Sequence, residues 1–279
     1  MQYRLTDLNG ESWLGPDSPV GLRYVRGIDG ASFEHQMIKG AGQRGATWLG
    51  KELAEGQIAI GANVNPARRL GVKGEGAVGV LSKWRDGLGE GEAERDGNQL
   101  RFRLVDTDRY QLVRLRERKP ADWEQMRVAG FFFDEVIFQA DDPDWYSDPE
   151  TYTFTPAEFG GATVANPGTV DAWVGYKLYG PITNPTLGIA GEAVKLPNLT
   201  SGQWLEINTD PNWYEVTDQA GADRTFNLTT LATAGGLDDR WRQQAKARTL
   251  SIPVTITGTG TTSATKLEVI VPRIWRSAL

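Results

Sequence analysis

The clearest structural signal in the chain is Leu100-Arg101-Phe102-Arg103-Leu104, in which apolar side chains alternate with arginines. A period of two places alternate side chains on opposite faces of a β-strand. A second alternating run covers residues 110–116, and the intervening Asp106-Thr107-Asp108 is typical of a hairpin turn. The sequence therefore predicts an antiparallel hairpin with one apolar face and one face rich in arginine.

Alternation of the same period recurs on both sides of this hairpin. The run 131–138 is apolar on both faces except at Asp134 and Glu135, a pattern typical of a central strand. The other predicted strands lie at residues 20–24, 57–60, 172–178, 205–207, 226–228, 250–256 and 267–271. Short strands of this kind, separated by turn residues, predict a mostly β protein.

One segment has a helical period instead. Ala77, Leu81, Trp84 and Leu88 recur at spacings of four, three and four, which predicts an amphipathic helix over 77–88. We expect it to be the only substantial helix of the first half. The glycine-rich acidic run 87–97 after it is expected to form an exposed loop, and residues 238–241 a single helical turn.

The acidic, proline-containing run 141–150 predicts a break in regular structure. A solvated linker is favoured there over a hard-cation site, because the spacing and turn glycine of an EF-hand are missing. We place a domain boundary near residue 155, giving domains 1–155 and 156–279, and a length of 279 residues fits two domains of about 150. The second domain is expected to be a jelly-roll-like or immunoglobulin-like sandwich.

Composition excludes many functions. The net charge is −6, which argues against nucleic-acid specificity, and the absence of cysteine together with a single histidine removes most metal and nucleophile chemistry. The match to G-x-G-x-x-G at 74–79 lacks the strand that a dinucleotide site needs before it. No apolar run reaches the ~18 residues of a membrane span, and no signal peptide is visible. We expect no cofactor, no metal and no catalytic residue.

Two groups of side chains are candidate contact residues. Arg101, Arg103, Arg114 and Arg116 lie on the predicted hairpin, and either contact a negatively charged neighbouring subunit or form a solvated face. Aromatic residues gather in the second domain, where most are expected in the core. Trp204 and Trp213 are the candidates for contact with a glycan or a partner protein.

The order of several short motifs is more specific than any one of them. The strand 131–139 leads into Ala140-Asp141-Asp142-Pro143-Asp144-Trp145-Tyr146, and the second domain begins near Asn166-Pro167-Gly168-Thr169. Gly180-Pro181-Ile182-Thr183-Asn184-Pro185 and Val271-Pro272-Arg273-Ile274-Trp275-Arg276 follow. Over nearly the whole chain this series resembles the distal tail proteins of long, non-contractile-tailed bacteriophages.

The resemblance implies a structural role. It implies an N-terminal β-sandwich belt domain with one helix, which packs into a homo-oligomeric, hexameric ring, and a C-terminal galectin-like or jelly-roll sandwich. The ring would join the tail tube protein to the tail-associated hub or baseplate protein, with the tape measure protein and host cell-wall glycan as further partners. The protein would be assembled in the host cytoplasm and reside in the virion, at the tail tip.

Two other functions stay open from the sequence. A carbohydrate-binding module attaching to cell-wall polysaccharide would use exposed aromatic residues such as Trp204 or Trp213. A cofactor-independent hydrolase would use two carboxylates, a pair that is defined by its separation in space and that sequence spacing does not reveal.

Overall fold

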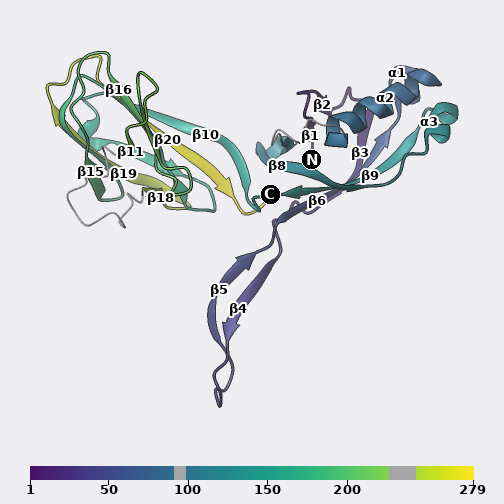
Figure 1. Cartoon of the computed structure of the whole chain (residues 1–279), viewed down its shortest axis with the longest axis horizontal. Coiled ribbons are helices and arrows are strands. Elements are labelled where there is room, and N and C mark those ends of the chain that lie inside the picture. The colour runs from purple at the N-terminus through teal and green to yellow at the C-terminus, as the bar shows by residue number, and fades with distance from the viewer. Residues whose placement is uncertain (91–98, 226–242) are drawn as a thin grey trace. The chain divides into compact units, whose positions relative to one another are not determined.

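The computed structural model describes residues 1–90, 99–225 and 243–279 (Figure 1). The chain forms two compact units. The first comprises Met1–Tyr146 together with Trp275–Leu279, and the second comprises Ser147–Ile274. The last residues of the chain therefore return to the unit in which it begins.

Two antiparallel sheets of the first unit share one strand, β8 (Arg109–Arg118). A register irregularity between Leu115 and Glu117 lets the first part of β8 pair with β7 and the second part with β9. One sheet has the order β2 (Ser12–Trp13), β1 (Tyr3–Thr6), β7 (Leu100–Leu104), β8, and the other β3 (Val20–Arg26), β6 (Gly56–Val64), β9 (Phe132–Ala140), β8. The predicted hairpin is thus confirmed, and β9 is a central strand as expected.

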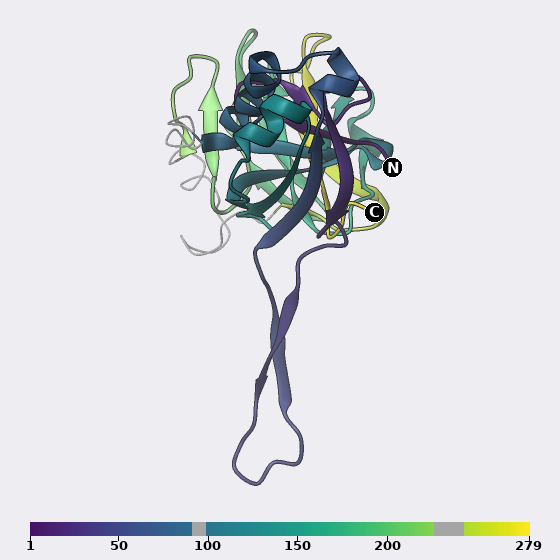
Figure 2. The same ribbon diagram turned by 90° about the vertical axis from the view of Figure 1, so that its right-hand side faces the viewer.

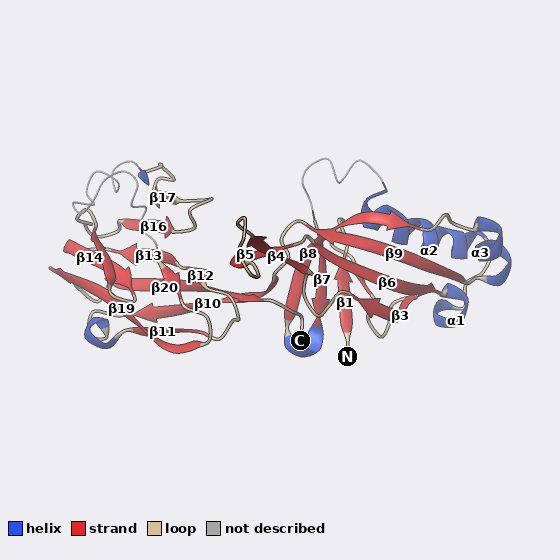
Figure 3. Cartoon of the chain, turned by 90° about the horizontal axis from the view of Figure 1, so that it is seen from below, coloured by secondary structure: helices blue, strands red, loops and turns tan. Residues whose placement is uncertain are grey.

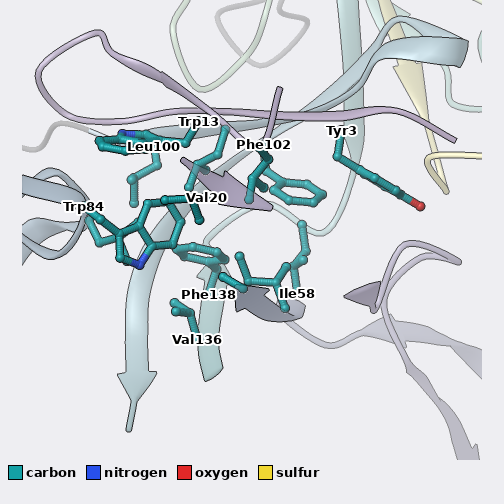
Figure 4. Packing of buried hydrophobic residues seen from close by; sticks show 14 of the residues in the cluster. Tyr3, Trp13, Val20, Ile58, Trp84, Leu100, Phe102, Val136 and Phe138 are labelled. Carbon is teal, nitrogen blue, oxygen red and sulfur yellow. The ribbon is translucent and has the colours of Figure 1, made fainter. Parts of the chain in front are cut away.

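The core of the first unit contains side chains from both sheets. Leu100, Phe102 and Leu104 are fully buried, which is the apolar face predicted from the alternation. Figure 4 shows Phe102 beside Tyr3, with Trp84 close to Phe138. Phe102 also packs edge-on against Trp145, at 6.3 Å between ring centroids.

The predicted helix is α2 (Glu75–Arg85), which continues as a π-helical turn over Asp86–Glu90. All four residues of the predicted apolar stripe are completely buried. Two short helices were not predicted, α1 (Pro66–Leu70) and α3 (Trp123–Ala129), because neither is long enough to show a stripe. Their signals lie at the ends: Asn65 and Asp122 cap the N-termini, and each helix is followed by a glycine in the left-handed conformation.

The second unit also contains two main sheets. One includes β17 (Glu215–Asp218), β16 (Trp204–Asn208), β13 (Gly175–Tyr179) and β20 (Lys266–Trp275), in that order. The other has the order β11 (Thr163–Asn166), β19 (Thr249–Thr259), β14 (Thr183–Ile189) and β15 (Glu192–Lys195). A short pair, β12 (Ala172–Trp173) and β18 (Gln244–Ala245), accompanies them. A core that includes Tyr176, Leu187 and Val269 fills this unit.

Some predictions fall outside the described residues: the strand 226–228, the turn 238–241 and most of the loop 87–97. The start of that loop was expected to be exposed, but residues 87–89 are buried in the π-helical turn. Another is corrected. The run 141–150 was expected to contain no strand, but β10 (Trp145–Phe154) begins inside it. Trp145 is fully buried and Ser147 nearly so, whereas Asp148 and Pro149 are exposed. The run therefore begins a strand with one buried face, despite its acids and prolines.

Candidate functional site

A two-stranded ribbon leaves the first unit between β3 and β6. It is formed by β4 (Phe33–Ile38) and β5 (Thr47–Leu53), and residues 33–53 are called the arm below. The strands pair from Phe33 with Leu53 to Ile38 with Thr47. Every residue of β4 is exposed, and Figure 2 shows the ribbon extending away from the strands that it connects. An isolated two-stranded ribbon is at best marginally stable in water.

One face of the arm carries a cluster of rings. Phe33, His35 and Met37 alternate along β4, and Met37 is paired with Trp48. The Trp48 indole N–H donates to Nδ1 of His35 at 3.1 Å, and the His35 ring meets Phe33 edge-on at 5.3 Å. Lys51 Nζ lies 3.6 Å from the centroid of the Phe33 ring. These contacts link the side chains on this face of the arm to one another.

These side chains are unusually exposed for their type. The exposed fractions are 49% for Phe33, 61% for Met37 and 61% for Trp48. Ile38 and Leu49, on the same ribbon, are 55% and 61% exposed. Apolar residues gathered in this way mark a surface that packs against another molecule, whereas single exposed apolar residues need no explanation.

The outer part of the arm, residues 35–51 between Glu34 and Glu52, differs in charge from the rest of the chain. Residues 35–51 include Lys39, Arg44 and Lys51 but no Asp or Glu, and therefore carry +3. Since the whole chain carries −6, the remaining residues carry −9. The outer part of the arm is a cationic, apolar element on an anionic protein.

The four candidate arginines of the predicted hairpin are exposed or partly exposed, but they have different contacts. Arg101 and Arg103 lie on the solvent side of β7. Arg101 stacks on Tyr110, with the guanidinium carbon 4.3 Å from the ring centroid, and Arg103 Nη2 pairs with Asp108 at 2.9 Å. The hairpin therefore brings these two arginines together around one tyrosine.

The other two candidate arginines lie further along β8. Arg114 Nε pairs with Asp141, in the linker run, at 3.3 Å. Arg116 is exposed at the register irregularity of β8. Within the described part of the chain, Arg103 and Arg114 each pair with an aspartate, whereas Arg101 and Arg116 make no ion pair.

The two tryptophan candidates of the second unit occupy different environments. Trp204 is partly buried in β16, and Lys177 Nζ lies 4.0 Å from its ring centroid. Lys177 also donates to Glu206 at 2.7 Å, and this hydrogen bond raises the pKa of Lys177, so the ammonium stays charged over the indole. Trp213 is 74% exposed and follows a turn closed by a hydrogen bond from its N–H to the Asp210 carbonyl, at 3.0 Å. Trp213 is thus the freer of the two rings.

No group of three or more His, Asp or Glu residues that could hold a metal ion occurs in the described part of the chain. Over those same residues, no helix is long and apolar enough to cross a membrane. Gly74, which begins the G-x-G-x-x-G match, caps α2 and is preceded by α1 instead of a strand, as the sequence indicated.

The arm is the surface that the sequence reasoning missed. The alternation of Phe33, His35 and Met37 was visible, and so was the glycine-rich turn at 40–45 that predicts a hairpin. The absence of acids from residues 35–51 was a further signal. None of these signals shows that the hairpin leaves the core.

Comparison with known proteins gives one consistent result. No known family profile matches the chain, and no curated protein sequence matches it. Among solved structures, the SPP1 Dit (gp 19.1) protein matches with a TM-score of 0.68 and 13% identity, covering 98% of this chain and 99% of that one. That protein is described as a paradigm of the hub adsorption apparatus in phages infecting Gram-positive bacteria.

Two structures of the phage P2 baseplate in its activated conformation, with Ca and with Sr, also match. Their TM-scores are 0.51 and 0.50 at 12% identity, and each match covers 98% of this chain and 97% of the other. The resemblance to distal tail proteins that the sequence indicated is therefore confirmed in three dimensions: the chain has a Dit-like fold along its whole length.

Proposed function

We propose that this protein is a structural component of a bacteriophage tail tip, without enzymatic activity, and that copies of it form a closed ring. The first unit is the ring-forming belt and the second unit is the lectin-like domain. The ring, a hexamer, joins the tail tube protein to the hub or baseplate protein in the virion. The full-length structural similarity to SPP1 Dit supports this role.

One observation supports assembly into a closed oligomer: the cluster of exposed aromatic and apolar side chains on the arm. A surface patch that meets a different patch on the next copy produces a ring when the rotation between copies closes. The apolar face of Phe33, Met37 and Trp48 would be such a patch. Its burial against a neighbouring copy would stabilise a two-stranded ribbon that is marginally stable by itself.

Charge supports contact between copies. Two chains of −6 repel each other as wholes, but the +3 of residues 35–51 on one copy is attracted by the −9 of the other copy's remainder. Such complementarity sets partner choice and association rate more than affinity. Because the Debye length is ~8 Å at physiological salt, assembly that depends on this attraction weakens as salt rises.

The arginine face is a second contact in this proposal. Arg101, Arg103, Arg114 and Arg116 would meet carboxylates of the next copy, with Arg101 and Arg116 contributing most because, among the residues that the structure describes, only Arg103 and Arg114 of the four pair with an acid. A guanidinium suits this role since it forms paired hydrogen bonds with a carboxylate.

The test is the mass of the full chain in solution, measured by light scattering over concentration and salt, with negative-stain images. We expect a closed ring that dissociates in Trp48→Ser. Trp213→Ser is the matched control, because Trp213 is even more exposed but lies on the second unit. A chain that remains monomeric throughout, or a Trp48→Ser variant that assembles as the parent does, would contradict the proposal.

Glycan binding by the second unit is the other candidate, and the exposure of Trp213 is the observation that favours it. A sugar stacks on a free aromatic face, and Lys177 already lies over Trp204. We expect any saturable binding of cell-wall polysaccharide to be lost in Trp213→Ala and kept in Trp204→Ala. If both variants bound the polysaccharide as well as the parent does, neither tryptophan would contribute to such a site.

A further inference from the structure

The root of the arm is in contact with the end of the chain. Residues 27–32 connect β3 to the arm, and Ile28 among them is buried, with 9% exposed. The backbone N–H of Ala278 donates to the Ile28 carbonyl at 2.9 Å, and Ala278 is itself fully buried. The C-terminal segment, Trp275–Leu279, thus packs directly against the residues from which the arm departs.

Gly30 makes this contact possible. Its φ of +104° is a conformation that other residues rarely adopt. A Cβ added there would lie 2.3 Å from the carbonyl oxygen of Arg276. The root and the C-terminal segment therefore approach more closely than any side chain at position 30 would allow.

The turn between β7 and β8 and the first residue of β8 also bind the C-terminal segment. Thr107 Oγ1 donates to the Ala278 carbonyl at 2.7 Å, and Arg109 Nη1 donates to the Ser277 carbonyl at 3.1 Å. The Arg109 guanidinium also lies 3.8 Å from the centroid of the Trp275 ring. Burial lowers the pKa of Arg109, and its buried Nε has no hydrogen-bond partner among the residues that the structure describes. The contacts of Arg109 with the C-terminal segment therefore form despite the desolvation of its guanidinium.

We propose that the C-terminal segment is a clasp that fixes the direction in which the arm leaves the first unit. Arg109 and Gly30 are then positioning residues for the assembly surface, although neither lies on it. This inference rests on the proposed function, because it assumes that the arm makes the contact between copies.

Direction matters because the arm acts as a lever. The six residues of β4 span about 20 Å. A rotation of about 10° at the root would therefore move the far end of the strand by about 3.5 Å, more than the length of a hydrogen bond. If an unclasped arm occupied the productive direction about a tenth of the time, assembly would require about tenfold more protein.

The test uses the absence of cysteine from the natural chain. Cysteines introduced at Ala41, an exposed position in the arm's turn, and at Glu124, an exposed position on α3, carry spin labels in the full chain. Pulsed dipolar spectroscopy of the dilute monomer then gives the distribution of distances between them. We expect a narrow distribution in the parent and broad ones in Gly30→Ala and Arg109→Gln.

Gly10→Ala is the matched control. Gly10 has a φ of +80°, and no atom of the described residues lies within 4 Å of an added Cβ, so this variant also strains a backbone of positive φ but causes no collision. Its distance distribution should remain as narrow as that of the parent. If Gly30→Ala and Arg109→Gln stayed equally narrow, the clasp would be refuted, whether or not the parent forms rings.

Assembly provides the second measurement. Both clasp variants should need about tenfold more protein than the parent to form rings, and Gly10→Ala should not. Rings that form at the parent's concentration despite a broad distribution would overturn the positioning role. A parent that forms no ring would contradict the proposed function, and the distance measurement would still decide on the clasp.

Discussion

Asp134 is expected to be among the most sensitive positions in the first unit. Its carboxylate is completely buried and accepts hydrogen bonds from Trp84 Nε1 at 3.1 Å, Arg85 Nε at 3.3 Å and Arg85 Nη2 at 2.9 Å. Arg85 is 3% exposed, so Asp134→Ala leaves its charge buried and unmatched. Loss of one partner of a buried pair costs about 3–5 kcal/mol.

This cost corresponds to a measurable shift. With an m-value of about 2 kcal/mol/M in urea, the midpoint of unfolding of the first unit should fall by about 2 M. Because the chain has two units, the transition should be followed by hydrogen exchange of amides in β6 and β9, which report on the first unit alone.

Glu135 is the internal control, since it follows Asp134 on the same strand but pairs at the surface with Lys119. Glu135→Gln should shift the midpoint much less, because the pair is partly solvated and Gln keeps an oxygen that accepts from the Tyr24 hydroxyl. The double variant Arg85→Met/Asp134→Leu should recover much of the loss, since it removes both charges. The reasoning would be refuted if Asp134→Ala shifted the midpoint no more than Glu135→Gln does.

Three further outcomes are expected. Leu81→Ala removes a fully buried side chain from α2 and should lower the stability of the first unit by about 2–5 kcal/mol, measured by urea unfolding. Asn166→Ala should lower that of the second unit by about 1–3 kcal/mol in the same assay, because the side chain bonds Val170 O at 3.0 Å, Ala245 O at 2.8 Å and Gly168 N at 2.9 Å. Hydrogen bonds from Arg224 and then the Ala222 amide lower the pKa of Asp218 in the fold. Its carboxylate therefore stabilises the second unit at pH values above the unfolded pKa of about 3.9. This contribution disappears as pH falls through the lower pKa of the folded state. In Asp218→Asn, the free energy of unfolding should therefore depend less steeply on pH in the acid range.

Periodicity predicted what a buried face determines. The alternation of Leu100, Phe102 and Leu104 and the helical spacing of Ala77 and Leu81 both reflect burial against the same core, and both predictions are confirmed. The motif Asn166-Pro167-Gly168-Thr169, used only as a mark of resemblance, has a physical basis in the three hydrogen bonds of the Asn166 side chain.

Periodicity could not predict features that depend on distant contacts. The alternation of Phe33, His35 and Met37 resembles that of a strand with one buried face, yet all three residues are exposed. Only the tertiary structure shows that, among the described residues, no sheet covers them. Likewise, nothing in the run Arg273-Ile274-Trp275-Arg276 indicates that it crosses from the second unit to the first.

The turn between β7 and β8 links the earliest sequence signal to the proposed assembly surface. Asp106-Thr107-Asp108 was interpreted only as the connection of a hairpin, and the left-handed conformation of Asp108, at φ +57°, fits that role. In the same turn, the Asp106 carboxylate accepts a hydrogen bond from the Gln2 backbone N–H, and the Thr107 hydroxyl donates one to the Ala278 carbonyl of the C-terminal segment. Figure 3 shows β1, β7 and β8 side by side near both ends of the chain. A substitution at Thr107 would leave the alternating core of the hairpin intact, so we expect it to affect the direction of the arm before it affects the fold.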